Sequence, residues 1–261
     1  MSYLSDFKSA PFGLFGVNGG VTSTDTSLAT IVGAPFTASD GRKFTIVQNG
    51  GTALVSGVLV QSPASIGANH TGLTCATAAI GATQITVTLG ATVVTANQYA
   101  GGYAVVSAGT GIGQTLKIQS HPAAAGSATV VLTLEDPLSV ATAVSDSKVS
   151  LTLPQYGSSN GTNVSTSGVV ISPTTATGRT IGVTITPIPA SSTTVPTYGF
   201  IQTAGAVAVL NDSATAIGLD VMPSSSVAGA VVTYAVATRN RVGTSTVAGE
   251  NTKAQLITLQ L

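Results

Sequence analysis

The stretch from Ala82 to Pro137 constrains the fold of this chain more than any other. Four short runs in it place apolar side chains at every second position: TQITVTL, YAVVSA, GQTLKIQS and ATVVLTLED. A period of two sends successive side chains to opposite faces of a β-strand. Gly101-Gly102, Gly109-Thr110-Gly111 and His121-Pro122 separate the runs and are typical turn residues. The stretch therefore predicts an antiparallel meander without a helical period.

Similar β-rich segments stand on both sides of this stretch. Asn49-Gly50-Gly51 predicts a hairpin that joins the strand RKFTIVQ to the strand ALVSGVLVQ. A short helical turn is expected around Cys75 to Ile80. Beyond residue 168, strand-like runs are broken by prolines, which belong at strand ends or on sheet edges. We expect an all-β fold of antiparallel β-sandwich or barrel-like modules, with an extended N-terminal arm and very little helix.

Composition divides the chain into four parts. Residues 1–36 are expected to form an extended arm, residues 37–154 a β-rich module, and residues 169–261 a second β-rich module. Between the modules, residues 155–168 are rich in Gly, Ser and Asn and predict a long loop or linker. Two separate β-lobes and one continuous sandwich both fit this pattern.

Charge is scarce in this sequence, and its scarcity excludes several functions. Only 7% of residues are charged, against ~25% in a typical soluble domain, and the 9 basic and 9 acidic residues give a formal net charge of zero. Nine scattered cations build no stripe that could neutralise phosphates, so we expect no nucleic-acid binding. No uninterrupted apolar run is long enough for a membrane helix. The composition favours a subunit largely buried in an assembly over a Thr/Ser-rich soluble monomer.

Residues that could do chemistry are few and dispersed. The glycines of Gly109–Gly113 lead into a strand instead of a helix, which indicates a hairpin and not a nucleotide-binding loop. No Gly-x-Ser-x-Gly element accompanies the two histidines, His70 and His121, and His121 is expected to hydrogen-bond in a turn or at a subunit contact. Cys75 is the only cysteine, so no intrachain disulfide can form, and with His70 it gives too few ligands for a metal site. We therefore expect no catalytic residue, cofactor or metal, and a protein that is not an enzyme.

Two groups of residues are candidates for contacts between subunits. Apolar residues crowd into the first fifteen positions outside any alternating pattern, and such residues mark either a disordered terminus or an anchor that docks on a neighbouring subunit; they are Tyr3, Leu4, Phe7, Phe12, Leu14 and Phe15. The same N-terminus lacks a basic region before a long apolar run, so no signal peptide is expected. Arg239 and Arg241 follow an apolar run, and each is a candidate partner for an acid on a neighbouring subunit or a solvated strand end.

Several segments resemble the capsid cement, decoration or head structural proteins of tailed bacteriophages. The resemblance is carried by DGRKFTIVQNGGTALVSGVLVQSPA, ANHTGL, ATQITVTLGATVVTANQYAGGYAVV and GQTLKIQSHPAAAGSATVVLTLEDPL, and it continues in SGVVISPTTATG, TYGFIQTAG and PSSSVAGAV. It covers roughly residues 40 to 238 and is weaker in the arm and in the last twenty residues.

The resemblance implies a non-enzymatic virion protein, made in the cytoplasm of the bacterial host and bound to the outer surface of an icosahedral head. Its partners would be the major capsid protein, whose neighbouring subunits it bridges, and itself, most often as a trimer. Two other classes remain open at this point. One is another phage structural protein, such as a tail-tube, fibre or major head subunit. The other is a carbohydrate-binding β-sandwich.

Overall fold

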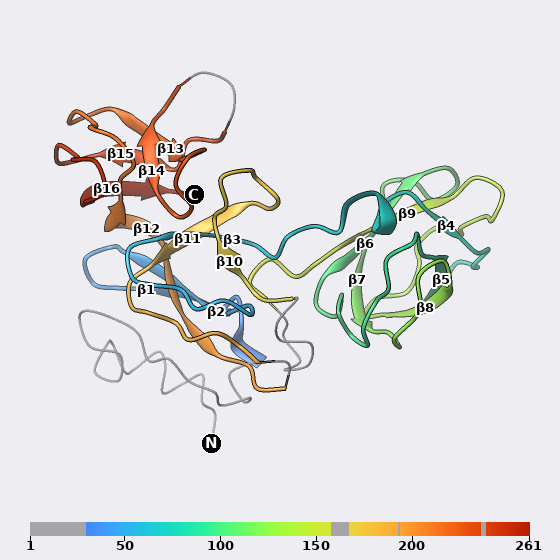
Figure 1. Ribbon diagram of the computed structural model, residues 1–261. Coiled ribbons are helices and arrows are strands. Elements are labelled where there is room, and N and C mark those ends of the chain that lie inside the picture. The colour runs from blue at the N-terminus through green and yellow to red at the C-terminus, as the bar shows by residue number, and fades with distance from the viewer. Residues whose placement is uncertain (1–29, 158–166, 193, 236–238) are drawn as a thin grey trace.

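The computed structural model describes residues 30–157, 167–192, 194–235 and 239–261, and within them the protein is almost entirely β. Its strands form a closed six-stranded barrel and a ten-stranded antiparallel sheet (Figure 1). The expected all-β fold is confirmed, and so is the barrel-like form of one module. Residues 1–29 of the expected N-terminal arm lie outside the described residues, whereas its last two residues belong to strand β1 (Pro35–Thr37) of the sheet.

The barrel is built from the middle of the chain. Its strands are β4 (Leu73–Cys75), β5 (Gln84–Thr88), β6 (Tyr103–Ala108), β7 (Thr115–Ser120), β8 (Thr129–Leu134) and β9 (Lys148–Thr152). Alternate side chains of these strands point inward, as the period of two predicted, and Ile85, Ile118 and Leu132 are fully buried in the barrel core. Thr, Ser, Lys and Gln occupy most outward positions, with Tyr103 and Val131 as exposed apolar exceptions.

The order of strands around the barrel is β4-β5-β8-β7-β6-β9, which is not the simple meander expected. Strands β6, β7 and β8 do follow one another as neighbours, but β5 pairs with β8 over its whole length. The long connection from Leu89 to Gly102 carries the chain across the barrel end, which gives a Greek-key arrangement. The alternation specified the strands, whereas their partners were set by contacts distant in sequence.

The ten-stranded sheet collects strands from both ends of the chain. Its N-terminal members are β1 (Pro35–Thr37), β2 (Lys43–Gln48) and β3 (Leu59–Gln61). Its C-terminal members are β10 (Val170–Ile171), β11 (Thr180–Thr184), β12 (Tyr198–Leu210), β13 (Asp220–Pro223), β14 (Val231–Thr233), β15 (Gly243–Ser245) and β16 (Ala254–Gln260). The main path is β10-β3-β11-β12-β16-β15-β13-β14, with β2 also paired to β12 and β1 to β2.

Strand β12 ties this sheet together. Its first half pairs with both β2 and β11, and its second half pairs with β16. The pairing with β2 shifts register between Gln202 and Ala204, and Gly205 follows with a φ of 91°. Such a bulge bends a strand and increases its twist. Both halves of the curved sheet therefore depend on one continuous strand with a bend in its middle.

Two local predictions in the N-terminal half are wrong. The expected hairpin at Asn49-Gly50-Gly51 does not form, because β2 pairs with β1 and β12 while β3 pairs with β10 and β11. The buried Asn49 side chain instead donates to the carbonyls of Ile188 and Pro189, at 3.2 and 2.8 Å, and so anchors a distant loop. The helical turn expected at Cys75–Ile80 is also absent. Cys75 ends strand β4, and a 3₁₀ turn, η2, occupies Gly67–His70.

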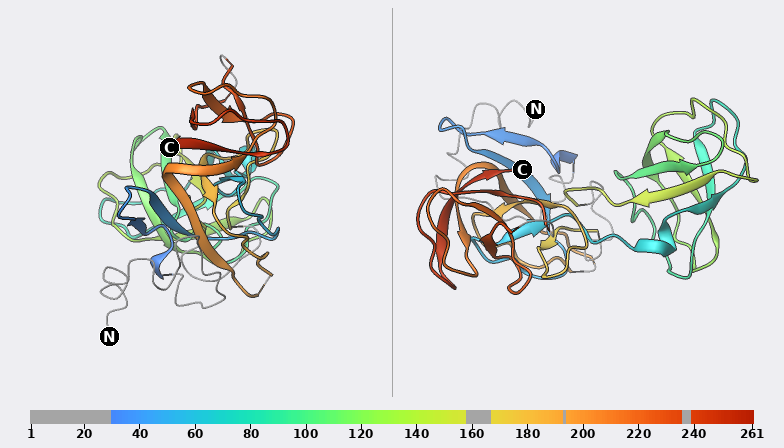
Figure 2. Two further views of the ribbon diagram at one scale, coloured as in Figure 1. Left: turned by 90° about the vertical axis from the view of Figure 1, so that its left-hand side faces the viewer. Right: turned by 90° about the horizontal axis from the view of Figure 1, so that it is seen from above.

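The barrel is an insertion in the sheet. The chain leaves the sheet after β3, forms the barrel, and returns at β10, which pairs directly with β3 (Figure 2). Strands β2 and β3 therefore belong to the same sheet as β10–β16, whereas the composition grouped them with the barrel strands in residues 37–154. On the return, Gln48 N donates to Tyr156 O, and Ser167 Oγ donates to Gln98 O of the barrel. The described ends of the 155–168 loop thus contact both the sheet and the barrel.

Candidate functional site

The predicted contact residues fall into two groups in the structure. Tyr3, Leu4, Phe7, Phe12, Leu14 and Phe15 lie outside the described residues. Arg239 and Arg241, in contrast, line one cavity of about 330 Å³. Arg179 joins them there, although it is far from both in sequence. We call this cavity the three-arginine pocket.

The three-arginine pocket lies between two groups of strands in the sheet. Strands β3 and β11 form one side, and strands β13 and β16 form the other. Arg179 precedes β11, while Arg239 and Arg241 precede β15, and Val242 on the pocket wall also belongs to the sheet core. The chain has four arginines in all, so three of them gather at one place. Sequence reasoning missed Arg179 because a single exposed arginine before a strand carries no local signal.

Two of these guanidinium groups are held in place by the protein. Arg239 Nη1 donates to Pro173 O at 3.0 Å, and its Nη2 donates to Thr174 O. Arg241 forms an ion pair with Asp220, with Nη1 and Oδ2 3.1 Å apart, and its Nη2 donates to Gln260 Oε1 at 2.6 Å. Carbonyl oxygens orient the Arg239 guanidinium without cancelling its charge. The pocket therefore has a surplus of positive charge.

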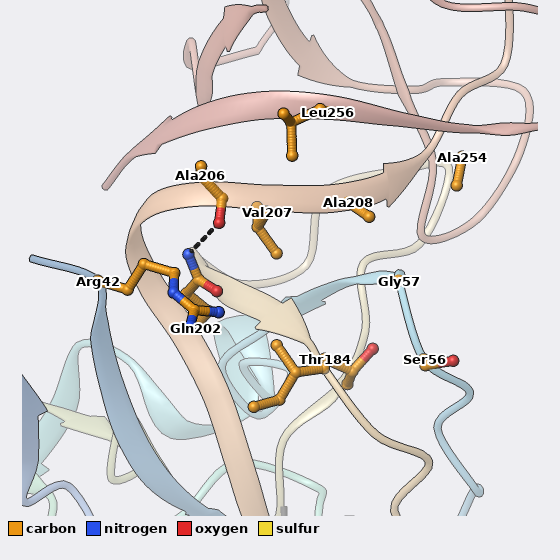
Figure 3. Close-up of a pocket in the computed structure, with 11 residues that line it drawn as sticks. Arg42, Ser56, Gly57, Thr184, Gln202, Ala206, Val207, Ala208, Ala254 and Leu256 are labelled. Carbon is orange, nitrogen blue, oxygen red and sulfur yellow. Dashed lines mark hydrogen bonds between the residues drawn. The ribbon is translucent and has the colours of Figure 1, made fainter. Parts of the chain in front are cut away.

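A second cavity of about 450 Å³ lies beside the bend of β12 (Figure 3). Its walls are mainly apolar, with contributions from Ile185, Val207 and Leu256, and its polar end holds Arg42 and Gln202. The Arg42 backbone N–H and Nε both donate to the Asp40 carboxylate, at 3.1 and 2.7 Å. These two bonds, the backbone one first, lower the pKa of Asp40.

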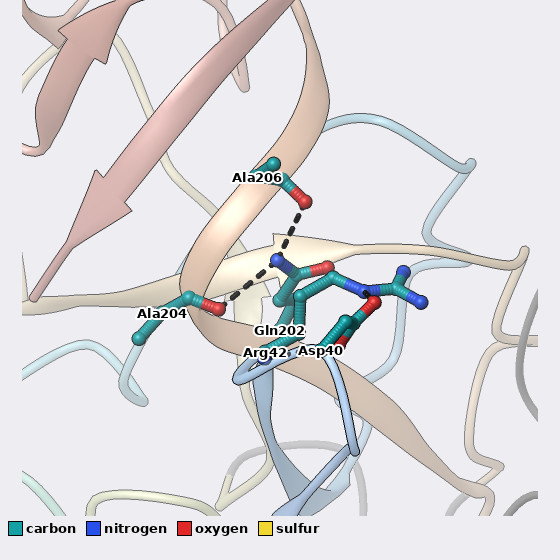
Figure 4. Close-up of polar contacts among 5 residues, drawn as sticks. All are labelled: Asp40, Arg42, Gln202, Ala204 and Ala206. Atoms are coloured by element: carbon teal, nitrogen blue, oxygen red, sulfur yellow. Dashed lines mark hydrogen bonds and ion pairs between the residues drawn. The ribbon is translucent and has the colours of Figure 1, made fainter.

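Gln202 stabilises the bend from inside this cavity. Its side-chain Nε2 donates to Ala204 O at 3.0 Å and to Ala206 O at 2.9 Å, which bridges the two sides of the bend (Figure 4). Both acceptors are carbonyls, so the nitrogen position is fixed by its partners. The buried Oε1 has no hydrogen-bond partner among the described residues. The cavity offers hydrogen bonding and one cation, but no nucleophile paired with a base.

The two histidines lie together, buried at the end of the barrel that faces the sheet. His70 Nδ1 is 2.5 Å from Tyr99 Oη, and His70 Nε2 is 3.0 Å from Thr92 O. The Thr92 carbonyl only accepts, so Nε2 carries the proton and Nδ1 accepts from Tyr99. His121 Nε2 accepts from the Tyr99 backbone N–H at 3.0 Å, and its Nδ1 donates to Pro122 O at 2.9 Å. His121 therefore forms its hydrogen bonds within the chain, directly after strand β7.

Burial shifts the pKa of two groups in this cluster, His121 and Tyr99. It lowers the pKa of His121, the bond to Pro122 opposes this shift, and the electrostatic interaction with His70 adds to it. Burial also raises the pKa of the Tyr99 hydroxyl. Every ring nitrogen of the two histidines has a hydrogen-bond partner in the barrel, so the cluster ties these segments to the barrel end.

The remaining candidate groups are structural. Gly109–Gly113 forms the turn between β6 and β7, as expected. Burial raises the pKa of the Cys75 thiol, against the effect of its contact with Thr142. Asp146 accepts from both the backbone N–H and the hydroxyl of Thr110, each at 3.0 Å. Among the described residues, no three His, Cys, Asp or Glu side chains converge as metal ligands would.

Exposed aliphatic side chains gather on the barrel end that lies opposite the sheet. Antiparallel pairing places the β4–β5, β6–β7 and β8–β9 loops at this end, whereas the chain enters β4 and leaves β9 at the other. Four branched side chains on these loops face solvent, and we call them the barrel tip: Ile80 (69% exposed), Ile112 (66%), Val144 (60%) and Val140 (46%).

Hydrogen bonds fix the three tip loops to one another. The Gln114 side chain accepts from the backbone of Ser139 and Val140, each at 3.0 Å, and donates to Val140 O at 2.9 Å. Gly81 N donates to Leu138 O at 2.8 Å. Loops held in this way present their apolar side chains as a fixed surface. Binding to such a surface would cost little ordering entropy.

Comparison with known proteins adds no relative. No protein-family model, curated protein or solved structure matches the chain. In the part of the chain that the structure describes, no helix is long and apolar enough to span a membrane.

Proposed function

We propose that this protein is a non-enzymatic structural protein of a bacteriophage virion. It binds the outer surface of an icosahedral head, bridges neighbouring major capsid subunits and stabilises the shell. It acts as a homo-oligomer, in the first instance a trimer. The sequence resemblance to capsid cement and decoration proteins motivates the proposal.

The barrel tip is the structural observation that carries this proposal. A barrel joined to the sheet at one end leaves its other end available to a neighbour (Figure 2). Exposed aliphatic side chains that sit together on fixed loops are typical of protein contact surfaces. The polar barrel walls around them, rich in Thr and Ser, resemble the rim of such a surface.

Co-sedimentation with phage heads tests the proposal. Purified protein is mixed with expanded heads that lack it, and the bound fraction is measured together with the temperature at which the heads break. The intact protein should bind in stoichiometric amount and raise that temperature. Heads that neither bind it nor gain stability would refute the proposal.

Substitution of the barrel tip locates the contact. The triple variant Ile80→Ser, Ile112→Ser, Val144→Ser should weaken head binding at least about tenfold, which corresponds to about 1.4 kcal/mol. The matched control is Val93→Ser with Ile217→Ser, since both side chains are exposed aliphatics, 58% and 67%, outside the tip. Equal binding by the two variants would exclude the tip as the contact.

Deletion of residues 1–29 tests the arm separately. If the six apolar arm residues anchor a neighbouring subunit, the shortened protein should lose its oligomeric state, measured by its mass in solution. An unchanged mass and unchanged head binding would show that the arm is dispensable.

A further inference from the structure

We propose that the three-arginine pocket binds carboxylate side chains from an acidic segment of a protein partner. The inference deepens the proposed function and rests on it, because the capsid shell is the surface that would supply the segment. Nothing in the barrel tip requires this pocket, which lies in the other module of the protein.

The charge distribution around the pocket calls for an anion. Arg179 is exposed, and its guanidinium makes no hydrogen bond or ion pair with the described residues. Arg239 has only neutral carbonyl partners, and Arg241 has one carboxylate, Asp220. Among the described residues, the three guanidinium groups thus share a single acidic side chain, that of Asp220, while Leu261 also lines the pocket. In a protein with so few charges, that imbalance is concentrated at one place.

Guanidinium chemistry favours a carboxylate in this position. Arginine stays charged at all physiological pH values and presents its N–H donors in a planar fork that matches two carboxylate oxygens. Each guanidinium has five such donors, and Arg239 uses only part of them for Pro173 and Thr174. The group is therefore oriented by the loop after β10 and still has donors for a ligand.

The remaining lining fits a peptide better than a nucleic acid. Ser172 and Asn240 provide polar groups for a peptide backbone, and Pro223 and Val242 provide apolar contact. A cavity of about 330 Å³ accommodates a few side chains. Nucleic acid would need cations in a stripe along its backbone, but the other described basic residues are dispersed: Arg42, Lys43, Lys117, Lys148 and Lys253.

A binding titration tests the pocket directly. The probe is a fluorescent peptide of alternating Glu and Gly, compared with the same peptide carrying Gln and with inorganic phosphate. The Glu peptide should bind, more weakly as salt is raised, and the Gln peptide should not. Arg179→Gln should weaken Glu-peptide binding at least about tenfold. Lys253→Gln removes one positive charge at the opposite end of β16 and should leave binding unchanged.

The outcomes separate this inference from the function it rests on. Binding of phosphate without the Glu peptide, or equal loss in both variants, would overturn the pocket as a peptide site. If the intact protein and Arg179→Gln also bind heads equally, the pocket has no part in capsid binding. Glu-peptide binding that depends on Arg179, in a protein that does not bind heads, would overturn the proposed function alone. Weaker head binding by Arg179→Gln supports both.

Discussion

At the scale of single residues, this protein depends on buried polar side chains that serve the backbone. Asn49, Gln202 and His121 each bond main-chain groups far along the chain or across a bend. A buried donor or acceptor that loses its partner costs about 1–3 kcal/mol. Such residues therefore fix loop positions in a chain whose turns and small side chains specify them weakly.

His121 makes stability depend on pH. Its pKa in the folded protein lies below the 6.5 of a free imidazole, so the unfolded chain binds a proton more readily. The contribution of His121 is thus fully present above pH 6.5 and is lost as pH falls through the lower, folded pKa. The free energy of unfolding should fall below pH 6.5 with a slope of up to about 1.4 kcal/mol per pH unit.

Chemical denaturation between pH 5 and 8 measures this slope. The His121→Gln variant keeps an oxygen acceptor for the Tyr99 N–H and cannot titrate, so its profile should be flatter than that of the natural protein. Identical slopes for both proteins would assign the pH dependence to other groups.

At the scale of strands, the sequence predicts which segments are extended and the local pairings of β6, β7 and β8, but not the pairings between strands distant in sequence. The alternating apolar residues of β5, β7 and β8 face the barrel core as predicted. The hairpin predicted at Asn49-Gly50-Gly51 does not form, and the Asn49 side chain instead bonds a loop distant in sequence. Arg179 could likewise not be grouped with Arg239 and Arg241 from the sequence, because only strand pairing in the sheet brings these distant residues together.

The bend in β12 requires glycine at position 205. Gly205 has a φ of 91°, and an added Cβ would come within 3.0 Å of Arg42 Cγ and 3.1 Å of Arg42 Cα. Gly205→Ala should therefore be destabilising through both backbone strain and a clash. Gly218 is the matched control, because its φ of 81° is similar but no atom lies within 4 Å of the added Cβ.

Thermal or chemical unfolding of the two variants separates these effects. Gly218→Ala should cost about 1–2 kcal/mol from the left-handed backbone alone, and Gly205→Ala should cost about 1 kcal/mol more. Equal losses would mean that Arg42 moves aside freely and that the bend tolerates a side chain.

At the scale of the whole molecule, the chain consists of two units with separate cores. The barrel core contains Ile85, Ile118 and Leu132, and the buried clusters of the sheet contain none of the barrel's residues. The barrel leaves from β3 and returns to β10, two strands that pair with each other. The two points where the barrel joins the sheet are therefore held together by the sheet itself. Each unit thus has the contacts it needs to fold alone.

A fragment of residues 64–155 should consequently fold by itself. It contains all six strands of the closed barrel and the buried cluster formed by His70, Tyr99 and His121. Cutting it out removes the described hydrogen bonds from Ser167 Oγ to Gln98 O and from Ser65 N to Thr177 O. We expect cooperative unfolding, measured by circular dichroism and denaturant titration.

Leu132→Ala provides the internal control. This side chain is fully buried, so its truncation should cost about 2–5 kcal/mol both in the fragment and in the barrel transition of the full chain. A fragment without a cooperative transition, or a Leu132→Ala effect that spreads to the sheet, would show that the two units fold as one.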